Sequence, residues 1–234
     1  MPLFGYYYDP TYILVLIGAV ITMIASIRVK STFSKFSKMT NHRGMTAEAC
    51  AAELLRYAGI RDVRIERISG SLTDHYSPNE KILRLSDTVY GSTSLAALGV
   101  AAHECGHAIQ HAVGYAPLKL RSASVPVANI GSWLSWPVLI LGVLLGLTPL
   151  AQAGIVLFSF VVVFQLITLP VEFDASRRAM QLLEERCILS GDELTGASRM
   201  LRAAALTYVA SLFSTLLQLL RLVLIVGRYT KRRD

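Results

Sequence analysis

Long apolar runs alternate with polar segments along the chain. The first run covers residues 11–27, close to the length needed to cross a bilayer. Two further runs, at residues 130–147 and 151–169, are joined only by Thr148-Pro149-Leu150. Such a short link makes the two segments antiparallel. The pattern therefore predicts a transmembrane anchor at residues 1–28 and a transmembrane hairpin at residues 126–170, with Pro170 ending or kinking the second helix.

The last apolar run, residues 206–226, carries one polar stripe with helical spacing: Ser211, Ser214, Thr215, Gln218 and Arg221. If this run crossed the membrane, the basic tail that follows it would face outside, against the positive-inside rule. The pattern predicts an apolar or amphipathic helix at residues 206–234, either spanning the membrane or lying at its interface.

The polar segments between these runs predict a soluble part at residues 29–125 and a helical segment at residues 171–205. Residues 46–57 have helical spacing, and an alanine-rich helix is expected over residues 93–113. Two short alternating stretches, at residues 63–68 and 82–85, predict a small antiparallel sheet element. We therefore expect a mainly α membrane protein with a small α+β soluble part.

Composition and charge agree with a membrane protein. Of the 234 residues, 53% are apolar and only 17% are charged, and the mean hydropathy is +0.48. The net charge is +7, and the Lys and Arg residues responsible for it lie beside the apolar runs. They form no patch interleaved with aromatic residues, so we expect no nucleic-acid partner. No Lys or Arg precedes the first run and several follow it, which predicts an outside N-terminus and a cytoplasmic segment after residue 28.

The flanks of the first apolar run and the three cysteines indicate the kind of membrane segment and the redox compartment. No basic stretch precedes the first run and no small-residue cleavage site follows it, so an anchor is favoured over a signal peptide. The three cysteines, Cys50, Cys105 and Cys187, are far apart and form no C-x-x-C pair. This argues against a disulfide framework and fits a reducing compartment.

The predicted alanine-rich helix contains Ala102-His103-Glu104-Cys105-Gly106-His107-Ala108. Residues four apart on an α-helix differ by only about 40° around its axis, so both imidazoles project from one face. That spacing allows His103 and His107 to share one tetrahedral Zn²⁺. Glu104 is placed where its carboxylate can activate a water molecule held by the metal.

A catalytic zinc needs a third protein ligand, and Glu172 is the candidate. It follows the predicted hairpin and returns to the side of the histidine helix; the alternative is a carboxylate favoured by a helix N-terminus. His111 is a rival, but three histidines spread over two turns converge poorly on one ion. Cys105 should point away from the ligand face as a small buried thiol.

Other polar residues allow two interpretations each, one functional and one purely structural. His75 or Tyr76 could donate a hydrogen bond to the oxyanion of a tetrahedral intermediate, or belong to a plain turn. Asp174 and Arg177 could orient a ligand or bind a substrate carboxylate, or lie on a solvated helix face.

Taken together, these stretches resemble the YugP-type neutral zinc metallopeptidases of bacterial membranes. The resemblance covers nearly the whole chain, through Tyr6-Tyr-Tyr-Asp-Pro-Thr-Tyr12, Ser71-Leu-Thr-Asp-His-Tyr-Ser-Pro78, Ala101-Ala-His-Glu-Cys-Gly-His-Ala-Ile-Gln-His111, Thr168-Leu-Pro-Val-Glu-Phe-Asp-Ala-Ser-Arg-Arg178 and Ala203-Ala-Ala-Leu-Thr-Tyr-Val-Ala210. It implies a zincin-like cytoplasmic metallopeptidase domain that binds one Zn²⁺ in a gluzincin-like manner, with His103, His107 and Glu172 as ligands.

The chain is more distantly similar to membrane peptidases of the HtpX and CAAX-processing type. Their third-ligand motif reads E-x-x-A-D, whereas this chain has Glu172-Phe-Asp-Ala-Ser176. An aspartate at the last position would support a ligating histidine, so either Ser176 or Asp174 takes that role, or the support differs.

The expected function is zinc-dependent endoproteolysis of membrane or membrane-proximal proteins at the cytoplasmic face of the bacterial cytoplasmic membrane. The expected partners are a protein or peptide substrate and the lipid bilayer. The alternative from another class is a zinc-stabilised membrane scaffold without turnover. A metal transporter is disfavoured, because the hairpin runs contain no Asp, Glu, His, Lys or Arg.

Overall fold

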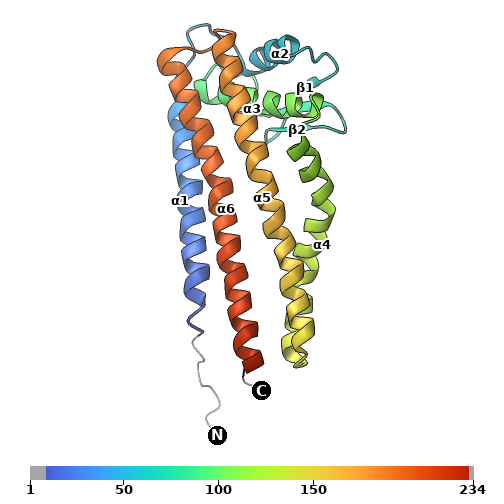
Figure 1. Ribbon diagram of the computed structural model, residues 1–234. Coiled ribbons are helices and arrows are strands. Elements are labelled where there is room, and N and C mark those ends of the chain that lie inside the picture. The colour runs from blue at the N-terminus through green and yellow to red at the C-terminus, as the bar shows by residue number, and fades with distance from the viewer. Residues whose placement is uncertain (1–8, 232–234) are drawn as a thin grey trace. The chain divides into compact units, whose positions relative to one another are not determined.

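The computed structural model describes residues 9–231. Within them the chain is mostly helical and has one small sheet (Figure 1). The elements in chain order are α1 (Tyr12–Phe36), α2 (Ala47–Tyr57), β1 (Arg64–Ile68), β2 (His75–Ser77), β3 (Ile82–Ser86), α3 (Leu95–Ala112), α4 (Ala116–Leu144), α5 (Thr148–Glu185) and α6 (Gly191–Lys231).

The chain divides into two compact units. Unit 1 takes residues up to 24, residues 124–166 and residues from 209 onward. Unit 2 takes residues 25–123 and 167–208. The boundaries predicted at residues 28, 125, 170 and 205 stay predictions of domain organisation.

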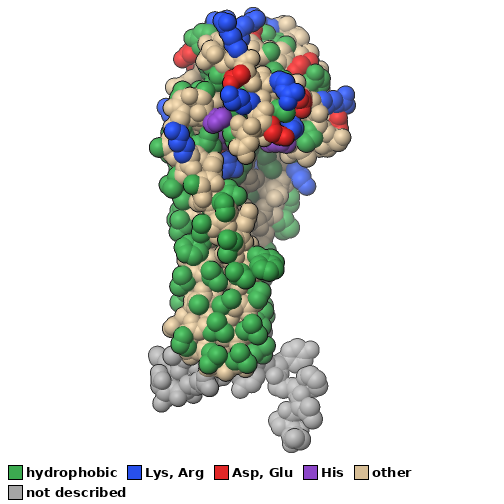
Figure 2. All heavy atoms as spheres, turned by 90° about the vertical axis from the view of Figure 1, so that its right-hand side faces the viewer, with side chains coloured by type: hydrophobic (Ala, Val, Ile, Leu, Met, Phe, Trp, Pro, Cys, Tyr) green, Lys and Arg blue, Asp and Glu red, His purple; other side chains and the backbone are tan. Residues whose placement is uncertain are grey.

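In the described part of the chain, four helices are long and apolar enough to cross a membrane: α1, α4, α5 and the stretch Gly191–Arg228 of α6. The ambiguous last run thus lies within a continuous candidate span. On the face that Figure 2 shows, the coloured side chains over the helices of unit 1 are hydrophobic, and Trp133 is 78% exposed. Large exposed apolar side chains around a helical bundle are what contact with lipid tails requires.

Small residues let the helices of unit 1 pack closely. A Cβ on Gly142 would lie 2.3 Å from the Ala151 nitrogen, and one on Gly154 would lie 2.7 Å from the Leu139 Cβ. Both contacts join α4 to α5. Close backbone approach at small residues is the usual way in which helices associate where lipid supplies no hydrophobic drive.

One charged side chain lies inside the apolar stretch of α6 and has partners within unit 1. The Arg221 guanidinium lies 3.7 Å from an Asp9 carboxylate oxygen, and its centre is 4.1 Å from the Tyr12 ring centroid. Asp9 also lies 3.5 Å from Arg228. These contacts compensate a charge that would otherwise be costly among apolar side chains.

The turn of the hairpin lies earlier than predicted. Helix α4 ends at Leu144, and Thr148 already begins α5. Gly146 has φ +68°, and the Leu147 and Gly146 amides donate to the carbonyls of Gly142 and Val143. This is a Schellman cap, and it leaves Pro149 in the first turn of α5, where the missing amide donor has no consequence.

Of the two outcomes expected at Pro170, an end of the helix or a kink, the structure excludes the end. Helix α5 continues through Pro170 to Glu185. The proline removes one backbone hydrogen bond, but Val171, Ala175 and Ala179 just beyond it are all fully buried. Packing of this face holds the helix together where local propensity would break it.

Unit 2 is built around α3, whose residues are buried on most sides. Helix α2 and the sheet pack against it, with Leu54, Leu83, Leu98 and Leu183 among the fully buried side chains. The helix bounds lie within two residues of the predicted 93–113. This position gives the histidine pair a rigid support.

The sheet has the strand order β1-β3-β2. The predicted antiparallel pairing of residues 63–68 with residues 82–85 is wrong, because β1 runs parallel to β3, with Arg64 opposite Ile82. The short strand β2 takes the antiparallel position on the other edge of β3, with His75 opposite Arg84. The chain reverses direction between β1 and β2 and again between β2 and β3, so β3 runs parallel to β1.

Candidate metal centre

Helix α3 fixes the two histidines. Its first turn is capped by Ser94, whose hydroxyl accepts a hydrogen bond from the Ala97 amide at 3.2 Å. One turn separates His103 from His107, and their ring centroids lie 4.7 Å apart with the planes at 80°. Their side chains are only 15% and 12% exposed. Both rings are therefore held in fixed, largely buried positions.

Gly106 lets α5 approach this face of α3. A Cβ on Gly106 would lie 2.5 Å from the Ala175 carbonyl oxygen and 3.0 Å from the Ala175 Cα. Only glycine allows the two backbones to come this close. Glu172 lies about one turn before Ala175 on α5, so this contact sets how far its carboxylate stands from the rings.

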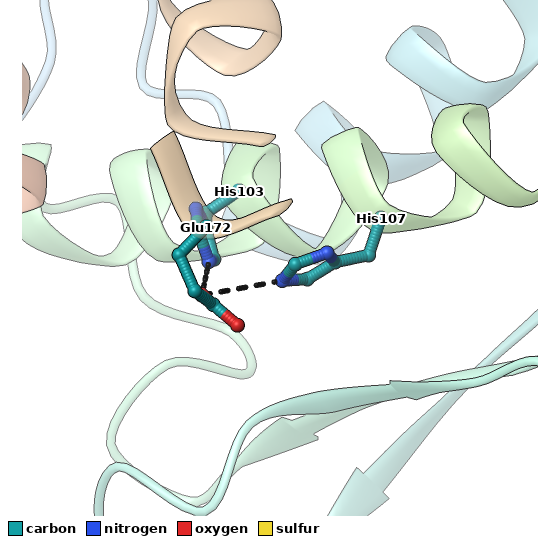
Figure 3. A group of neighbouring side chains, drawn as sticks. All are labelled: His103, His107 and Glu172. Carbon is teal, nitrogen blue, oxygen red and sulfur yellow. Dashed lines mark hydrogen bonds and ion pairs between the residues drawn. The ribbon is translucent and has the colours of Figure 1, made fainter. Parts of the chain in front are cut away.

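The three side chains converge (Figure 3). Glu172 Oε2 lies 3.3 Å from His103 Nε2 and 3.6 Å from His107 Nε2. Ligand atoms about 2.1 Å from a tetrahedral Zn²⁺ would be roughly 3.4 Å apart. The ligand atoms of the three residues all lie within 4.8 Å of one another. Their distances and their two-nitrogen, one-oxygen donor set fit one zinc ion.

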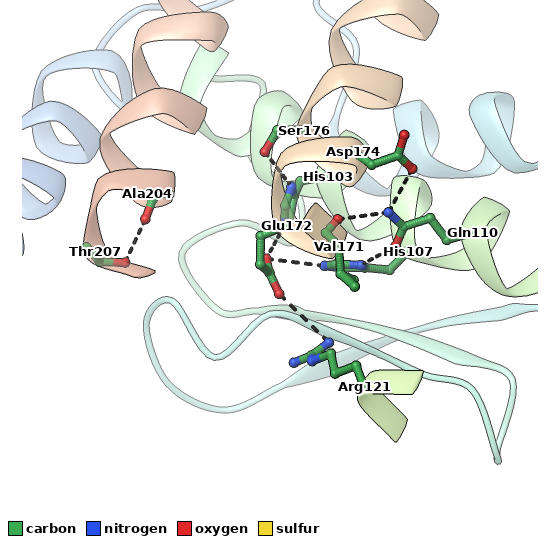
Figure 4. Close-up of polar contacts among 10 residues, drawn as sticks. All are labelled: His103, His107, Gln110, Arg121, Val171, Glu172, Asp174, Ser176, Ala204 and Thr207. Atoms are coloured by element: carbon green, nitrogen blue, oxygen red, sulfur yellow. Dashed lines mark hydrogen bonds and ion pairs between the residues drawn. The ribbon is translucent and has the colours of Figure 1, made fainter. Parts of the chain in front are cut away.

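Gln110 supports His107 from behind (Figure 4). It is fully buried, and its amide nitrogen donates to the Val171 carbonyl at 2.8 Å and to Asp174 Oδ2 at 2.9 Å. Both amide hydrogens are therefore used, and its Oε1 faces His107 Nδ1 at 3.0 Å. An oxygen there requires a proton on Nδ1, which leaves the Nε2 lone pair directed at the Glu172 carboxylate.

A lone pair facing a carboxylate requires a cation between them, either a proton or a metal ion. The pKa of His107 follows this logic. Burial lowers it, but the hydrogen bond to Glu172 and the charge of Glu104 outweigh burial and raise the pKa above its usual value. The same field that attracts a proton attracts a divalent metal.

Ser176 and Asp174 each support one histidine. The Ser176 hydroxyl lies 3.1 Å from His103 Nδ1. Asp174 reaches His107 through Gln110, and its carboxylate also accepts hydrogen bonds from Arg177 and Arg178. Arg177 thus contacts Asp174 on its own helix.

The other predicted candidates lie elsewhere. The Tyr76 hydroxyl is 2.9 Å from Nδ1 of His111, which is exposed. His75 contacts the Thr73 carbonyl and Arg84 through its two ring nitrogens. None of the three belongs to the converging group or lines the cavity beside it. The structure therefore does not bring them to the candidate centre.

A cavity of about 230 Å³ adjoins the group within unit 2. Glu104, which is 7% exposed, lines it together with His103 and Glu172. Tyr208 from α6 also lines it. A substrate atom in this cavity would meet the carboxylate of Glu104 and the tyrosine together.

Sequence reasoning missed Gln110, Arg121 and Tyr208. Gln110 left a signal, since it is a polar residue three positions after His107 on an otherwise apolar helix. Arg121 lies 3.8 Å from Glu172 Oε1 (Figure 4) but comes from α4, a different helix. Nothing in the sequence links Arg121 to the histidines, and Tyr208 left only its place in the stretch Ala203–Ala210 that carries the family resemblance.

Cys105 is buried, as predicted, and Cys50 is buried as well. Cys105 and Cys50 are free and buried, and Cys105 Sγ faces the Ala51 carbonyl at 3.6 Å. Burial raises the pKa of Cys105 and raises the pKa of Cys50 to about 12. Both thiols therefore stay protonated and inert.

Four candidate spans and a His-His-Glu group define a membrane protein with a candidate metal centre. A family described as "putative neutral zinc metallopeptidase" matches residues 11–227. The chain belongs to this family, as the resemblance predicted, and a zinc peptidase family implies zinc.

A Bacillus subtilis (strain 168) protein named "Putative membrane protease YugP" is 46% identical to the chain over 202 residues. The match covers 86% of this chain and 89% of that protein. No solved structure matches the chain.

Proposed function

We propose that this protein is a zinc-dependent endopeptidase that cleaves membrane or membrane-proximal proteins at the cytoplasmic face of the bacterial cytoplasmic membrane. The observation that carries the proposal is the convergence of His103, His107 and Glu172 beside a cavity lined by Glu104. Membership of the zinc metallopeptidase family supports the peptidase class.

His103, His107 and Glu172 would hold the zinc, with Nε2 as the ligand atom of each histidine. When bound, the ion would act as a Lewis acid that polarises the scissile carbonyl and makes water more acidic. Glu104 accepts the proton of the attacking water and passes it to the leaving amine. Its position in the cavity wall, one residue after a ligand, suits this transfer.

Two features support a cytoplasmic site. Lys and Arg residues follow the first apolar run and none precedes it, so residues after 28 should face the cytoplasm. The cysteines that the structure describes are all free, and the only exposed one is Cys187. Free thiols suit a reducing compartment.

The test compares three variants of purified protein in detergent or nanodiscs. Glu104→Gln should keep stoichiometric zinc and lower kcat/KM on an unfolded protein substrate by about 10²- to 10⁴-fold. His103→Ala should lose the zinc. His111→Ala changes a histidine on the same helix outside the group, and it should keep both zinc and activity.

The scaffold alternative predicts a different result. Wild-type protein would then bind zinc and lose stability on chelation, yet show no chelator-sensitive cleavage. Full activity of Glu104→Gln would show that the assigned base is wrong.

A further inference from the structure

A second cavity, of about 370 Å³, lies between α1 and α6 within unit 2. It is separate from the metal group, and no metal ligand lines it. Its polar lining consists of four cations and two hydroxyls: Arg28, Ser31, Thr32, Lys35, Arg199 and Arg202.

The positive charge of this cavity has no acidic counterpart. No carboxylate lines the cavity, and across residues 9–231 none of its four cations is in an ion pair. Four uncompensated cations around one small volume create a strong positive potential. Such a site fits a phosphate group, which guanidinium groups bind by paired hydrogen bonds.

The cavity is lined by one stripe of residues on α1 and one on α6. The lining positions on α1 are 28, 31, 32, 35 and 36, and those on α6 are 199, 202, 203 and 206. Both sets have the i, i+3, i+4, i+7 spacing of a single helix face. Gly196 keeps the helices close, since a Cβ there would lie 3.0 Å from the Phe36 ring. The four cations are exposed side chains that project from two packed helices, not from a loop.

The cavity lies where the apolar runs of two candidate spans end. Arg28 directly follows the run at residues 11–27, and Arg202 precedes the run at residues 206–226 by four positions. Leu206, at the start of the second run, is itself part of the lining. Cations at the end of a span stand at headgroup level, and an apolar wall suits an acyl chain.

We propose that this cavity binds the headgroup phosphate of an anionic phospholipid. Its phosphate would contact Arg28, Arg199 and Arg202, and Ser31 can donate to a headgroup oxygen, whereas the Thr32 hydroxyl already donates to the Arg28 carbonyl at 2.7 Å. A free phosphate ion would satisfy the cations but make no use of Leu206 and the neighbouring spans. The mixed charge and apolar lining therefore favours the lipid.

The same turns of α6 line the metal-side cavity with their other face. Met200, Ala204 and Tyr208 face that cavity, whereas Arg199, Arg202 and Leu206 face the basic one. A headgroup held between α1 and α6 would fix the helix that presents Tyr208. This step rests on the proposed function, and it makes peptidase activity dependent on anionic lipid.

The binding test uses the Glu104→Gln protein, so that its outcome is independent of catalysis. Detergent-purified protein is titrated with phosphatidylglycerol or phosphatidylcholine, and bound lipid is counted by native mass spectrometry. Phosphatidylglycerol should bind more tightly. Adding Arg199→Gln and Arg202→Gln should weaken its binding about 30-fold, which corresponds to about 2 kcal/mol for two cations near an anionic lipid.

The matched control adds Lys30→Gln in α1 and Lys38→Gln two residues after its end, which remove the same charge outside the cavity lining. It should change the affinity by less than about threefold, because charges outside the cavity act only through screened solvent. Thermal unfolding checks that both double variants are folded. Equal weakening in the two, or no preference for phosphatidylglycerol, overturns the proposal.

Two further arms separate the sources of phosphate and the effect on activity. Inorganic phosphate that binds as tightly as phosphatidylglycerol, with loss in the Arg199→Gln/Arg202→Gln protein, overturns the lipid assignment. Tight, arginine-dependent binding of a single-stranded oligonucleotide does so too. Active protein should cleave faster in phosphatidylglycerol nanodiscs than in phosphatidylcholine nanodiscs, and equal rates would overturn the coupling to activity. Absence of cleavage in both, with lipid binding intact, would instead contradict the proposed peptidase.

Discussion

Replacement of Gly106 by alanine tests how the candidate centre is assembled. The added Cβ would lie 2.5 Å from the Ala175 carbonyl oxygen, and 3.0 Å from the Ala175 Cα and carbonyl carbon. Ordinary carbon contacts begin near 3.5 Å, so α5 would have to move away by roughly 1 Å. Because the contact atoms are backbone, no side chain can rotate to relieve it.

Glu172 lies on the same helix, about one turn before the contact, and would move with it. Metal–ligand distances tolerate changes of only about 0.2 Å, so a shift of roughly 1 Å removes Glu172 from the coordination sphere or distorts it. We expect Gly106→Ala to weaken zinc binding by at least about 100-fold, the upper range for loss of ligand support. Overpacking should also lower the free energy of unfolding by about 1–3 kcal/mol, partly offset by the higher helix propensity of alanine.

The assay is a competition titration of zinc against a chromophoric chelator, with thermal unfolding measured alongside. Gly99→Ala is the matched control, since it makes the same change on α3, and its Cβ would meet the Ala197 Cβ at an ordinary 3.5 Å. That variant should keep wild-type zinc affinity. Equal zinc affinity in the two variants would refute the reasoning, because either Glu172 is no ligand or α5 is not held against α3 at Gly106.

Three further predictions concern the surroundings of the ligands. Gln110→Ala should weaken zinc binding about 10- to 100-fold, because His107 loses the acceptor that fixes its tautomer; unchanged affinity in the chelator titration would contradict this. Tyr208→Phe should lower kcat by about 10²- to 10³-fold at unchanged zinc content if its hydroxyl stabilises the developing oxyanion, and steady-state kinetics would show this. Zinc affinity should fall as the pH falls through the raised pKa of His107, because the protonated ring cannot be a ligand. The fall should be about tenfold per pH unit for each proton displaced, and a zinc affinity that stays constant between pH 8 and about 6.5 would contradict this.

The sequence was sufficient for features that depend on local periodicity. Two histidines four apart on a helix must share a face, and their ring centroids lie 4.7 Å apart. The apolar runs likewise predicted three spans and left the fourth run open between a span and an interfacial helix, and within residues 9–231 four helices are long and apolar enough to cross a membrane. Family resemblance selected Glu172, which physics alone left open between a ligand and a helix-end carboxylate. The structure then places its carboxylate within 3.6 Å of both Nε2 atoms.

Features that depend on contacts between distant segments could not be predicted. Gln110 contacts Asp174, 64 positions away, and Arg121 approaches Glu172 from another helix. The predicted direction of the strand pairing was wrong, because the residue pattern of strands of three to five residues is too short to determine whether they pair parallel or antiparallel. The sequence also could not decide whether Pro170 ends the second hairpin helix or lies inside it, because the packing that supports the helix beyond Pro170 involves distant segments.

The serine at position 176 is consistent with the charge already gathered around the histidines. Glu104 and Glu172 are both buried carboxylates, and Asp174 is a third, compensated by two arginines. An aspartate in place of Ser176, beside His103, would add a fourth anion to this group with no described cation assigned to it, at a substantial desolvation cost. A hydroxyl can accept the Nδ1 proton of His103 and orient the ring without adding charge. Support of the two rings is thereby divided, with a neutral acceptor behind His103 and a carboxylate that acts on His107 only through the Gln110 amide.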